Sequence, residues 1–210
     1  MQIITISPSR KSQQQVWLKF DDGTLLPFKV DDIVRLKLSK FTDISSDFFQ
    51  TILVASATYL LLEYSLRQIA ISPKTEKSLQ QKLKIYCQKL KFKYNFSLDL
   101  IYPLIDSTVQ RIVDDGLIDN QGYVDHLLRK YPRKSSAEIS YLLRQQGITY
   151  APKLDSSVEI TKIKNIIIKK YSSYNLADYN VKNKLVSNLA RKGFPIEFIK
   201  TAIDEIGEVR

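Results

Sequence analysis

The sequence predicts a mainly α-helical protein, in which three tandem three-helix repeats form an elongated, curved array behind a small N-terminal β-hairpin region. Two observations predict this class. Before about residue 45 apolar residues alternate with polar ones, as in strands, whereas from Ser46 onward they recur at helical spacing. An apolar pair followed by a glycine also recurs along the chain, which is typical of stacked helical repeats.

The N-terminal strands are predicted from alternation and from one turn. Residues 3–6 alternate as a strand would, and residues 16–20 do so again. The Asp-Asp-Gly of residues 21–23 is a strong hairpin signal, so residues 25–30 are expected to return as the partner strand. Pro27 has no N–H to donate, and it therefore predicts an edge position for this strand.

The first repeat is predicted to begin with a long helix over residues 47–68, which is apolar on most sides. The Ser-Pro-Lys-Thr of residues 72–75 marks a new helix start, because proline is well tolerated at the first helical position. Leu79 and Leu83 are expected to form the inner stripe of that helix.

Start and stop signals are clearest in residues 112–148, which predict three short helices with tight turns. Gly116 is expected to end one helix in the left-handed conformation, with Leu117 folding back on the last turn. Asp119 stands where the next helix needs an N-cap. That helix is expected to stop just before Pro132, since the residue before a proline is disfavoured in the α conformation.

Two further helix starts carry the pattern of a capping box. In the first, Ser135 is expected to accept a hydrogen bond from the backbone while Glu138 reaches back. In the second, Asp155 and the Ser156-Ser157-Val158-Glu159 that follows it are expected to form the box at the start of an isoleucine-rich helix, with Glu159 as the returning carboxylate. A last helix is predicted over residues 195–206.

The repeat signature has the same spacing in the second and third repeats, namely Ile139, Leu143 and Gly147 against Leu185, Leu189 and Gly193. In the first repeat Leu79 and Leu83 hold the first two positions, and Cys87 stands where the glycine would be. The predicted division is a β-hairpin region at residues 1–45 and three-helix repeats at residues 46–103, 104–154 and 155–210.

The order of these signals resembles the central repeat of the RecX family. The shared features are the Gly-Leu-Ile-Asp of residues 116–119, the Ser-x-x-Glu-Ile of residues 135–139 and the Gly-Ile of residues 147–148. The resemblance continues over residues 158–206 and is weak in the first repeat, where Ser78 replaces the glutamate typical of the family. Members of this family are regulators that inhibit the RecA recombinase.

The residues that could carry catalysis are few. His126 and Cys87 are the only histidine and cysteine, which excludes a histidine-based triad and a cysteine metal cluster. Asp114, Asp115 and Asp119 leave a Mg²⁺-dependent nuclease as an alternative, although a role as helix N-cap explains Asp119 completely and is favoured. The sequence therefore predicts a protein that is not an enzyme and needs no cofactor and no metal.

The charge of the chain favours a polyanionic partner. Lys and Arg number 32 against 22 Asp and Glu, which gives a formal net charge of +10. The basic residues either solvate helix faces or form one binding face, in which tyrosines are interleaved. The residues predicted to bind the partner or nucleic acid are Arg129, Lys130, Arg133, Lys134, Arg144, Lys169, Lys170, Arg191 and Lys192.

The resemblance implies a regulator that lies in the groove of the RecA–single-stranded DNA filament, bridges protomers and blocks strand exchange, ATP turnover and filament growth. It thereby implies a role in recombination, DNA repair and the SOS response. Single- or double-stranded DNA are further expected partners. The N-terminus lacks the basic-then-apolar order of a signal peptide, so a cytoplasmic monomer with no membrane partner is expected.

One alternative comes from a different class of function. A stand-alone basic helical protein could bind nucleic acid without any recombinase, and its affinity for DNA would then fall steeply with salt.

Overall fold

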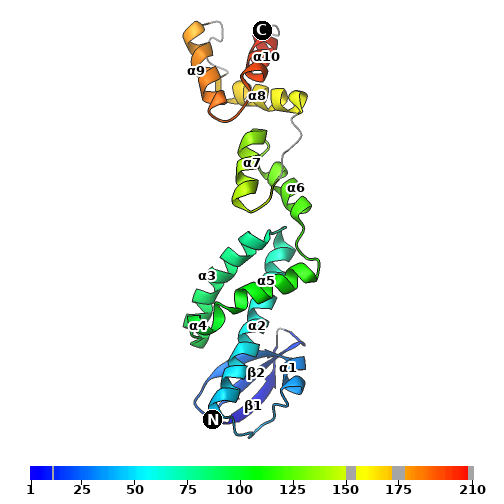
Figure 1. Cartoon of the computed structure of the whole chain (residues 1–210), viewed down its shortest axis with the longest axis vertical. Coiled ribbons are helices and arrows are strands. Elements are labelled where there is room, and N and C mark those ends of the chain that lie inside the picture. Colours follow the sequence, from blue (N-terminus) through cyan, green and yellow to red (C-terminus); the bar gives the residue numbers. More distant parts are fainter. Residues whose placement is uncertain (11, 150–154, 172–177, 208–210) are drawn as a thin grey trace. The chain divides into compact units, whose positions relative to one another are not determined.

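The computed structural model describes residues 1–10, 12–149, 155–171 and 178–207, and the chain divides into two compact units, Met1–Asp119 and Asn120–Arg210 (Figure 1). Helices dominate both units, and a small antiparallel sheet opens the first, which confirms the predicted mainly α class. Among the helices in the described ranges, none combines the length and the apolar character that a bilayer crossing requires.

The sheet has three antiparallel strands in the order β1 (Ile3–Pro8), β2 (Gln15–Phe20) and β3 (Leu25–Lys29). The predicted turn lies between β2 and β3, where Gly23 has a φ of +87°. Pro27 lies on β3 at the edge of the sheet, as predicted, so its missing N–H removes no bond from a central ladder.

One face of the sheet is apolar and packs against the long helix α2 (Ser46–Ile71). The alternation of β2 and β3 buries Leu18 and Phe20 beside Leu26 and Phe28. On the helix, Phe49 meets the ring of Phe20 edge to face with 5.3 Å between centroids. A short helix, α1 (Val30–Arg35), follows β3 directly.

A buried hydrogen bond also ties α2 to the sheet edge. The hydroxyl of Ser56, which is fully buried, donates to the backbone carbonyl of Pro27 over 2.8 Å. Buried polar groups need a partner, and here the serine provides one for itself and for the carbonyl. This contact could not be predicted from a local pattern, because it joins residues 29 positions apart.

Three further helices complete the first unit: α3 (Glu76–Tyr94), α4 (Leu98–Ile101) and α5 (Leu104–Asp114). Thr75 caps α3, and Ser78 closes a capping box with it, so the serine fills the role of the family glutamate. The predicted stripe of Leu79 and Leu83 is buried, and Cys87 continues it.

Helix α5 contacts α2 and α3, and its Ile105, Val109 and Ile112 belong to the core of the first unit. The predicted second repeat begins at this helix, and the boundary at residue 104 stays a prediction. Gly116 ends α5 with a φ of +68°, as predicted. Leu117 folds its N–H back to the carbonyl of Ile112, but its side chain is 40% exposed.

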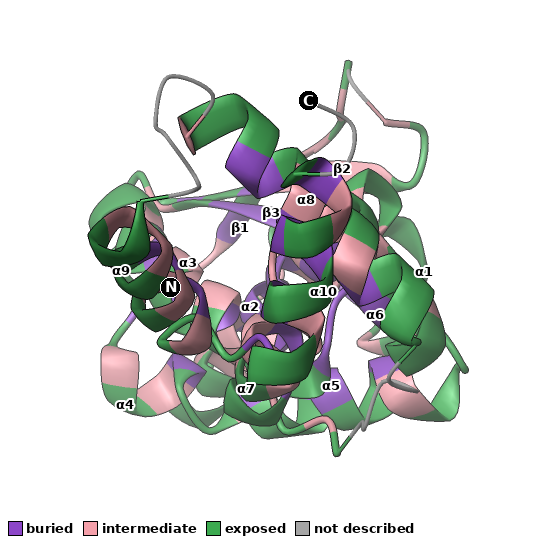
Figure 2. Ribbon diagram, turned by 90° about the horizontal axis from the view of Figure 1, so that it is seen from above, coloured by how far each residue is buried: buried purple, intermediate pink, exposed green. Residues whose placement is uncertain are grey.

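The second unit contains α6 (Asn120–Lys130), α7 (Ser136–Gln145), α8 (Ser156–Tyr171), α9 (Tyr179–Ala190) and α10 (Ile196–Gly207). Two separate apolar clusters lie within it, one between α6 and α7 and one among α8, α9 and α10. In Figure 2 buried and exposed residues alternate along several of the helices, as expected for helices with one apolar face. The predicted pairs of the repeat signature, Ile139 with Leu143 and Leu185 with Leu189, lie in these two clusters.

The Ser56 contact makes the first prediction. Replacing Ser56 by alanine leaves the buried carbonyl of Pro27 without this donor and should lower the free energy of unfolding by about 1–3 kcal/mol. Guanidinium unfolding followed by circular dichroism measures the effect, and the matched control is Ser107→Ala on the exposed side of α5. Equal stabilities of the two variants would mean that the bond contributes nothing.

Candidate functional site

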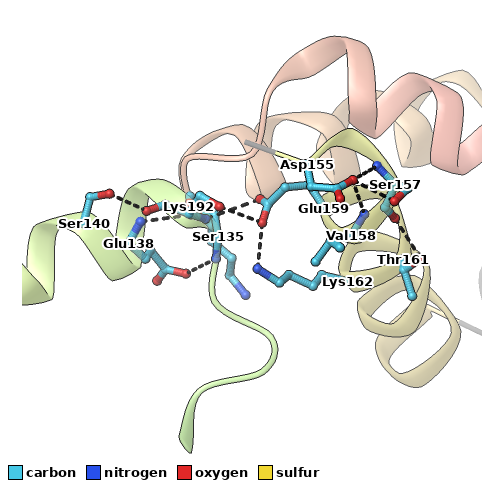
Figure 3. Close-up of polar contacts among 11 residues, drawn as sticks. Ser135, Glu138, Ser140, Asp155, Ser157, Val158, Glu159, Thr161, Lys162 and Lys192 are labelled. Atoms are coloured by element: carbon cyan, nitrogen blue, oxygen red, sulfur yellow. Dashed lines mark hydrogen bonds and ion pairs between the residues drawn. The ribbon is translucent and has the colours of Figure 1, made fainter. Parts of the chain in front are cut away.

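Three helix termini meet in the second unit: the start of α7, the first turn of α8 and the turn between α9 and α10 (Figure 3). The start of α7 carries the predicted capping box. The hydroxyl of Ser135 accepts from the N–H of Glu138 over 3.1 Å, and the Glu138 carboxylate accepts from the N–H of Ser135 over 3.3 Å. The box satisfies two donors at the helix start, which confirms the prediction.

Ser135 has a second role that the sequence did not reveal. Its hydroxyl donates to the backbone carbonyl of Lys192 over 2.5 Å, in the turn between α9 and α10. The residue is fully buried, so both capacities of the hydroxyl are used within the protein. This hydrogen bond links the N-cap of α7 to a turn 57 residues further along the chain.

Gly193 lets these two segments approach closely. It has a φ of +80°, and a Cβ built on it would lie 2.7 Å from the Cβ of Ala137 and 3.2 Å from the hydroxyl oxygen of Ser135. Two features therefore require a glycine at position 193. One is the left-handed backbone that ends α9, and the other is the close packing of the turn against α7.

The start of α8 differs from the prediction in one residue. Asp155 caps the helix as expected, accepting from the N–H of Ser157 over 2.9 Å and from the N–H of Val158 over 3.3 Å. The hydroxyl of Ser157 donates to the same oxygen and is the main cause that lowers the pKa of Asp155. The expectation that Glu159 completes this cap is wrong, because its carboxylate turns to α7 instead.

Glu159 is a buried carboxylate shared between two helices. It accepts from the N–H of Ser136 over 3.3 Å and from the hydroxyl of Ser136 over 3.0 Å. Within α8, the ammonium of Lys162 pairs with it over 2.7 Å. The side chain of Glu159 is 1% exposed, and its charge is balanced by a cation and by the positive end of the α7 dipole.

The predicted basic residues nearest to this junction flank the turn between α6 and α7. Arg129 and Lys130 end α6, and Arg133 and Lys134 follow in the turn. The ammonium groups of Lys130 and Lys134 lie 5.4 and 5.6 Å from the centroid of the Tyr131 ring. Two cations on one aromatic ring hold a concentrated positive charge at this turn.

The turn between α9 and α10 brings a second basic pair to the same place. The carbonyl of Lys192 accepts the hydrogen bond from Ser135. Arg191 and Lys192 therefore lie near Arg133 and Lys134 in space, although the two pairs are far apart along the chain. Arg191 donates to the side chain of Asn188 and is exposed. We call Arg133, Lys134, Arg191 and Lys192 the junction basic group.

The remaining predicted residues lie away from the junction. Arg144 lies in the last turn of α7, at the end opposite to Ser135, and Lys169 and Lys170 lie in the last turn of α8. All three are exposed. In the described part of the second unit, no hydrogen bond or ion pair brings any of them to the junction basic group.

Beside the junction lies a cavity of about 500 Å³ that the sequence did not predict. Leu128, Tyr131 and Pro132 line it from the α6 side, and Val158 and Lys162 line it from α8. The lining joins residues about thirty positions apart, so no local pattern could have identified it. It gives the basic turn an apolar neighbour that a partner side chain could fill.

Comparison with known proteins shows a similarity to RecX proteins. The family profile described as "RecX, third three-helix domain" matches residues 158–203, which include most of α8, α9 and α10. A protein of Streptococcus equi subsp. zooepidemicus named "Regulatory protein RecX" is 26% identical over 210 residues, covering 96% of this chain and 76% of that protein. The chain is similar to RecX family proteins in sequence.

Two more proteins show the same similarity. A "Regulatory protein RecX" of Chlorobium phaeobacteroides is 28% identical over 111 residues and covers 49% of this chain and 72% of its own length. A solved structure titled "Crystal structure of regulatory protein RecX" superposes with a TM-score of 0.67 at 18% identity, over 97% of this chain and 98% of that one. At this identity the likeness of the structures shows a RecX fold.

The acidic residues that suggested a nuclease are placed as follows in this chain. Asp114 accepts from the side chain of Gln110 over 2.8 Å, and Asp119 directly precedes α6. In the described ranges, no three His, Cys, Asp or Glu side chains are arranged to hold a metal ion. His126 is half-buried on α6, and burial raises the pKa of the Cys87 thiol to about 11.

The double role of Ser135 makes the second prediction. Ser135→Ala removes the cap of α7 and the bond to Lys192 together, so the loss of stability should lie near the upper end of the roughly 0.5–2 kcal/mol known for N-caps. Denaturant unfolding of the full chain measures it. Ser187→Ala, an exposed site on α9, is the control. If Ser135→Ala unfolds at the same denaturant concentration as the parent, the cap is not a source of stability.

Glu159 makes the third prediction. Glu159→Ala leaves Lys162 and the start of α7 without their acceptor and should cost about 3 kcal/mol, the lower end for a broken buried pair, since the Lys162 side chain is 16% exposed. The double variant Glu159→Ala with Lys162→Met should recover part of that loss, because it leaves no unpaired charge. Glu197→Ala, on the exposed first turn of α10, should have little effect. A similar small effect at Glu159 would contradict the proposed importance of the junction.

Proposed function

We propose that this chain regulates the RecA recombinase by binding the RecA–single-stranded DNA filament and inhibiting its activity. The observation that carries the proposal is the likeness to proteins named regulatory protein RecX, which extends over 96% of this chain in the streptococcal relative. By this proposal the protein acts by binding and takes part in recombination, DNA repair and the SOS response. It would do so as a cytoplasmic monomer without a cofactor or a membrane partner.

The junction basic group is proposed as the centre of the binding face. It combines four cationic side chains with an apolar cavity beside them, and a nucleoprotein filament offers both phosphates and protein surface. The turns that carry these residues are held by buried hydrogen bonds, whereas Arg133, Arg191 and Lys192 are exposed and Lys134 is half-buried. Such pre-organisation lowers the entropy lost on binding.

Arg129, Lys130, Arg144, Lys169 and Lys170 are proposed to extend this face. They lie at the carboxyl ends of α6, α7 and α8, where a cation is also favoured by the helix dipole. Contacts at several helix ends would let one chain touch successive subunits of a filament, and linked weak contacts raise the overall affinity. The proposed division into three tandem three-helix repeats suits this mode of binding.

A second function is favoured by the charge alone. A net charge of +10 would also suit a helical protein that binds single- or double-stranded DNA without any recombinase. The two functions differ in how binding responds to salt and to the presence of RecA. Direct DNA binding would fall steeply as salt rises and would not change when RecA is absent.

Charge reversal tests the proposed function and is the fourth prediction. The double variant Arg133→Glu with Lys134→Glu should need an about tenfold higher concentration for half-inhibition of RecA ATP hydrolysis on single-stranded DNA, because like charges that face each other at an interface cost several kcal/mol. Raising salt should weaken inhibition by the parent more than by the variant, since salt screens exposed charges.

The matched control reverses two exposed lysines of the first unit, Lys84→Glu with Lys89→Glu. Each pair changes the net charge by −4, from +10 to +6, so a general charge effect would act equally on both. Equal inhibition by the two double variants would remove the junction basic group from the interface. No inhibition by the parent at any concentration would refute the recombinase as partner.

A further inference from the structure

The first unit contains a pocket of about 680 Å³ that the proposed function does not use. It opens between the β1–β2 hairpin, α2 and α3, and each of these elements contributes one cation to its lining: Arg10, Arg67 and Lys93 respectively. Glu63 is the one carboxylate among the lining residues in the described part of the chain. The lining therefore carries a surplus of two positive charges, from three cations and one anion.

These cations are loosely engaged by the protein itself. The guanidinium of Arg67 lies 3.9 Å from the carboxylate of Glu63, at the outer limit for an ion pair, and its side chain is 61% exposed. The ammonium of Lys93 lies 5.0 Å from the centroid of the Tyr94 ring. Both cations can turn to an anion in the pocket without breaking a buried bond.

Aromatic rings form the rest of the distinctive lining. Trp17, Tyr86 and Tyr94 all line the pocket. Tyr86 is fixed by a parallel stack on Tyr64, with 4.1 Å between ring centroids and 6° between planes. Burial raises the pKa of Tyr86 to about 12, so its hydroxyl remains a hydrogen-bond donor at neutral pH. Flat rings beside cations are the combination that recognises a planar base attached to phosphate.

We propose that this pocket binds a nucleotide, with Arg10, Arg67 and Lys93 holding the phosphates and the aromatic rings holding the base. The volume lies within the roughly 300–1,000 Å³ of small-ligand sites, so it suits one nucleotide rather than a long segment. The nucleotide has two sources, a free nucleoside triphosphate or one unit of a single-stranded nucleic acid. The inference goes beyond the proposed function, because it needs neither the recombinase nor the junction basic group.

The chain carries its own reporter for this site. Trp17 is the only tryptophan, so a ligand that stacks in the pocket should change the whole tryptophan emission of the protein. The full chain is titrated without RecA, with ATP in one arm and an oligothymidylate single strand in the other. Calorimetry of the same mixtures gives the affinity independently. Saturable quenching in the ATP arm identifies a free nucleotide as ligand, and quenching by the strand alone identifies a unit of nucleic acid.

Two variants test whether the pocket is responsible, and this is the fifth prediction. Arg67→Gln combined with Lys93→Gln should weaken binding at least about tenfold, since each phosphate contact by a cation is a charge-assisted hydrogen bond. Arg10→Gln, an exposed turn residue, gives a second test that leaves the helices unchanged. Arg111→Gln, exposed on α5 of the same unit and outside the pocket, should bind as the parent does. Thermal melts verify that all variants fold.

Three outcomes would overturn the inference. The first is the absence of quenching and heat in both arms. The second is unchanged binding by the variants in Arg67 with Lys93 and in Arg10. The third is equally tight binding of inorganic tripolyphosphate or polyglutamate, because the pocket would then recognise negative charge without a base. None of these outcomes bears on RecA inhibition, which the reversal at Arg133 and Lys134 tests separately.

Discussion

The second unit depends on one buried carboxylate, that of Glu159. A helix start leaves backbone N–H groups without partners, and at α7 the residues of α7 itself satisfy only part of them. Glu159 reaches across from α8 to accept from Ser136, and Lys162 balances its charge. The two apolar clusters of this unit are thus joined through a polar contact. Hydrogen bonds are directional, so this junction fixes orientation more narrowly than apolar packing would.

Helix α3 differs from α7 and α9 at one position of the repeat signature. Gly147 and Gly193 take a left-handed backbone just after the ends of α7 and α9, whereas Cys87 stands at the same spacing and stays helical inside α3. Because the helix is not stopped there, it continues to Tyr94. This extension carries Lys93 and Tyr94 to the pocket of the first unit. Because no glycine ends the helix at position 87, α3 is long enough to line part of the pocket proposed to bind a nucleotide.

The sequence predicted what depends on neighbours along the chain and missed what depends on distant ones. The capping box at Ser135, the left-handed Gly116 and the edge strand with Pro27 are all as expected, because each is decided within a few residues. Glu159 fitted a local cap equally well, and only the presence of α7 decides its direction. The cavity between α6 and α8 was missed for the same reason.

The predicted basic residues show that the fold decides which charged side chains lie together on the surface. Their charge was visible in the sequence, but the pairing of one turn with another depends on contacts between distant residues, namely the bond from Ser135 to Lys192 and the packing of Gly193 on Ala137. Lys134 is further tied to Glu138, which itself caps the backbone of Ser135, so charge and capping share one network. A change that loosens the cap would therefore also disperse the charges. Stability at the start of α7 and the density of positive charge beside it are two consequences of the same contacts.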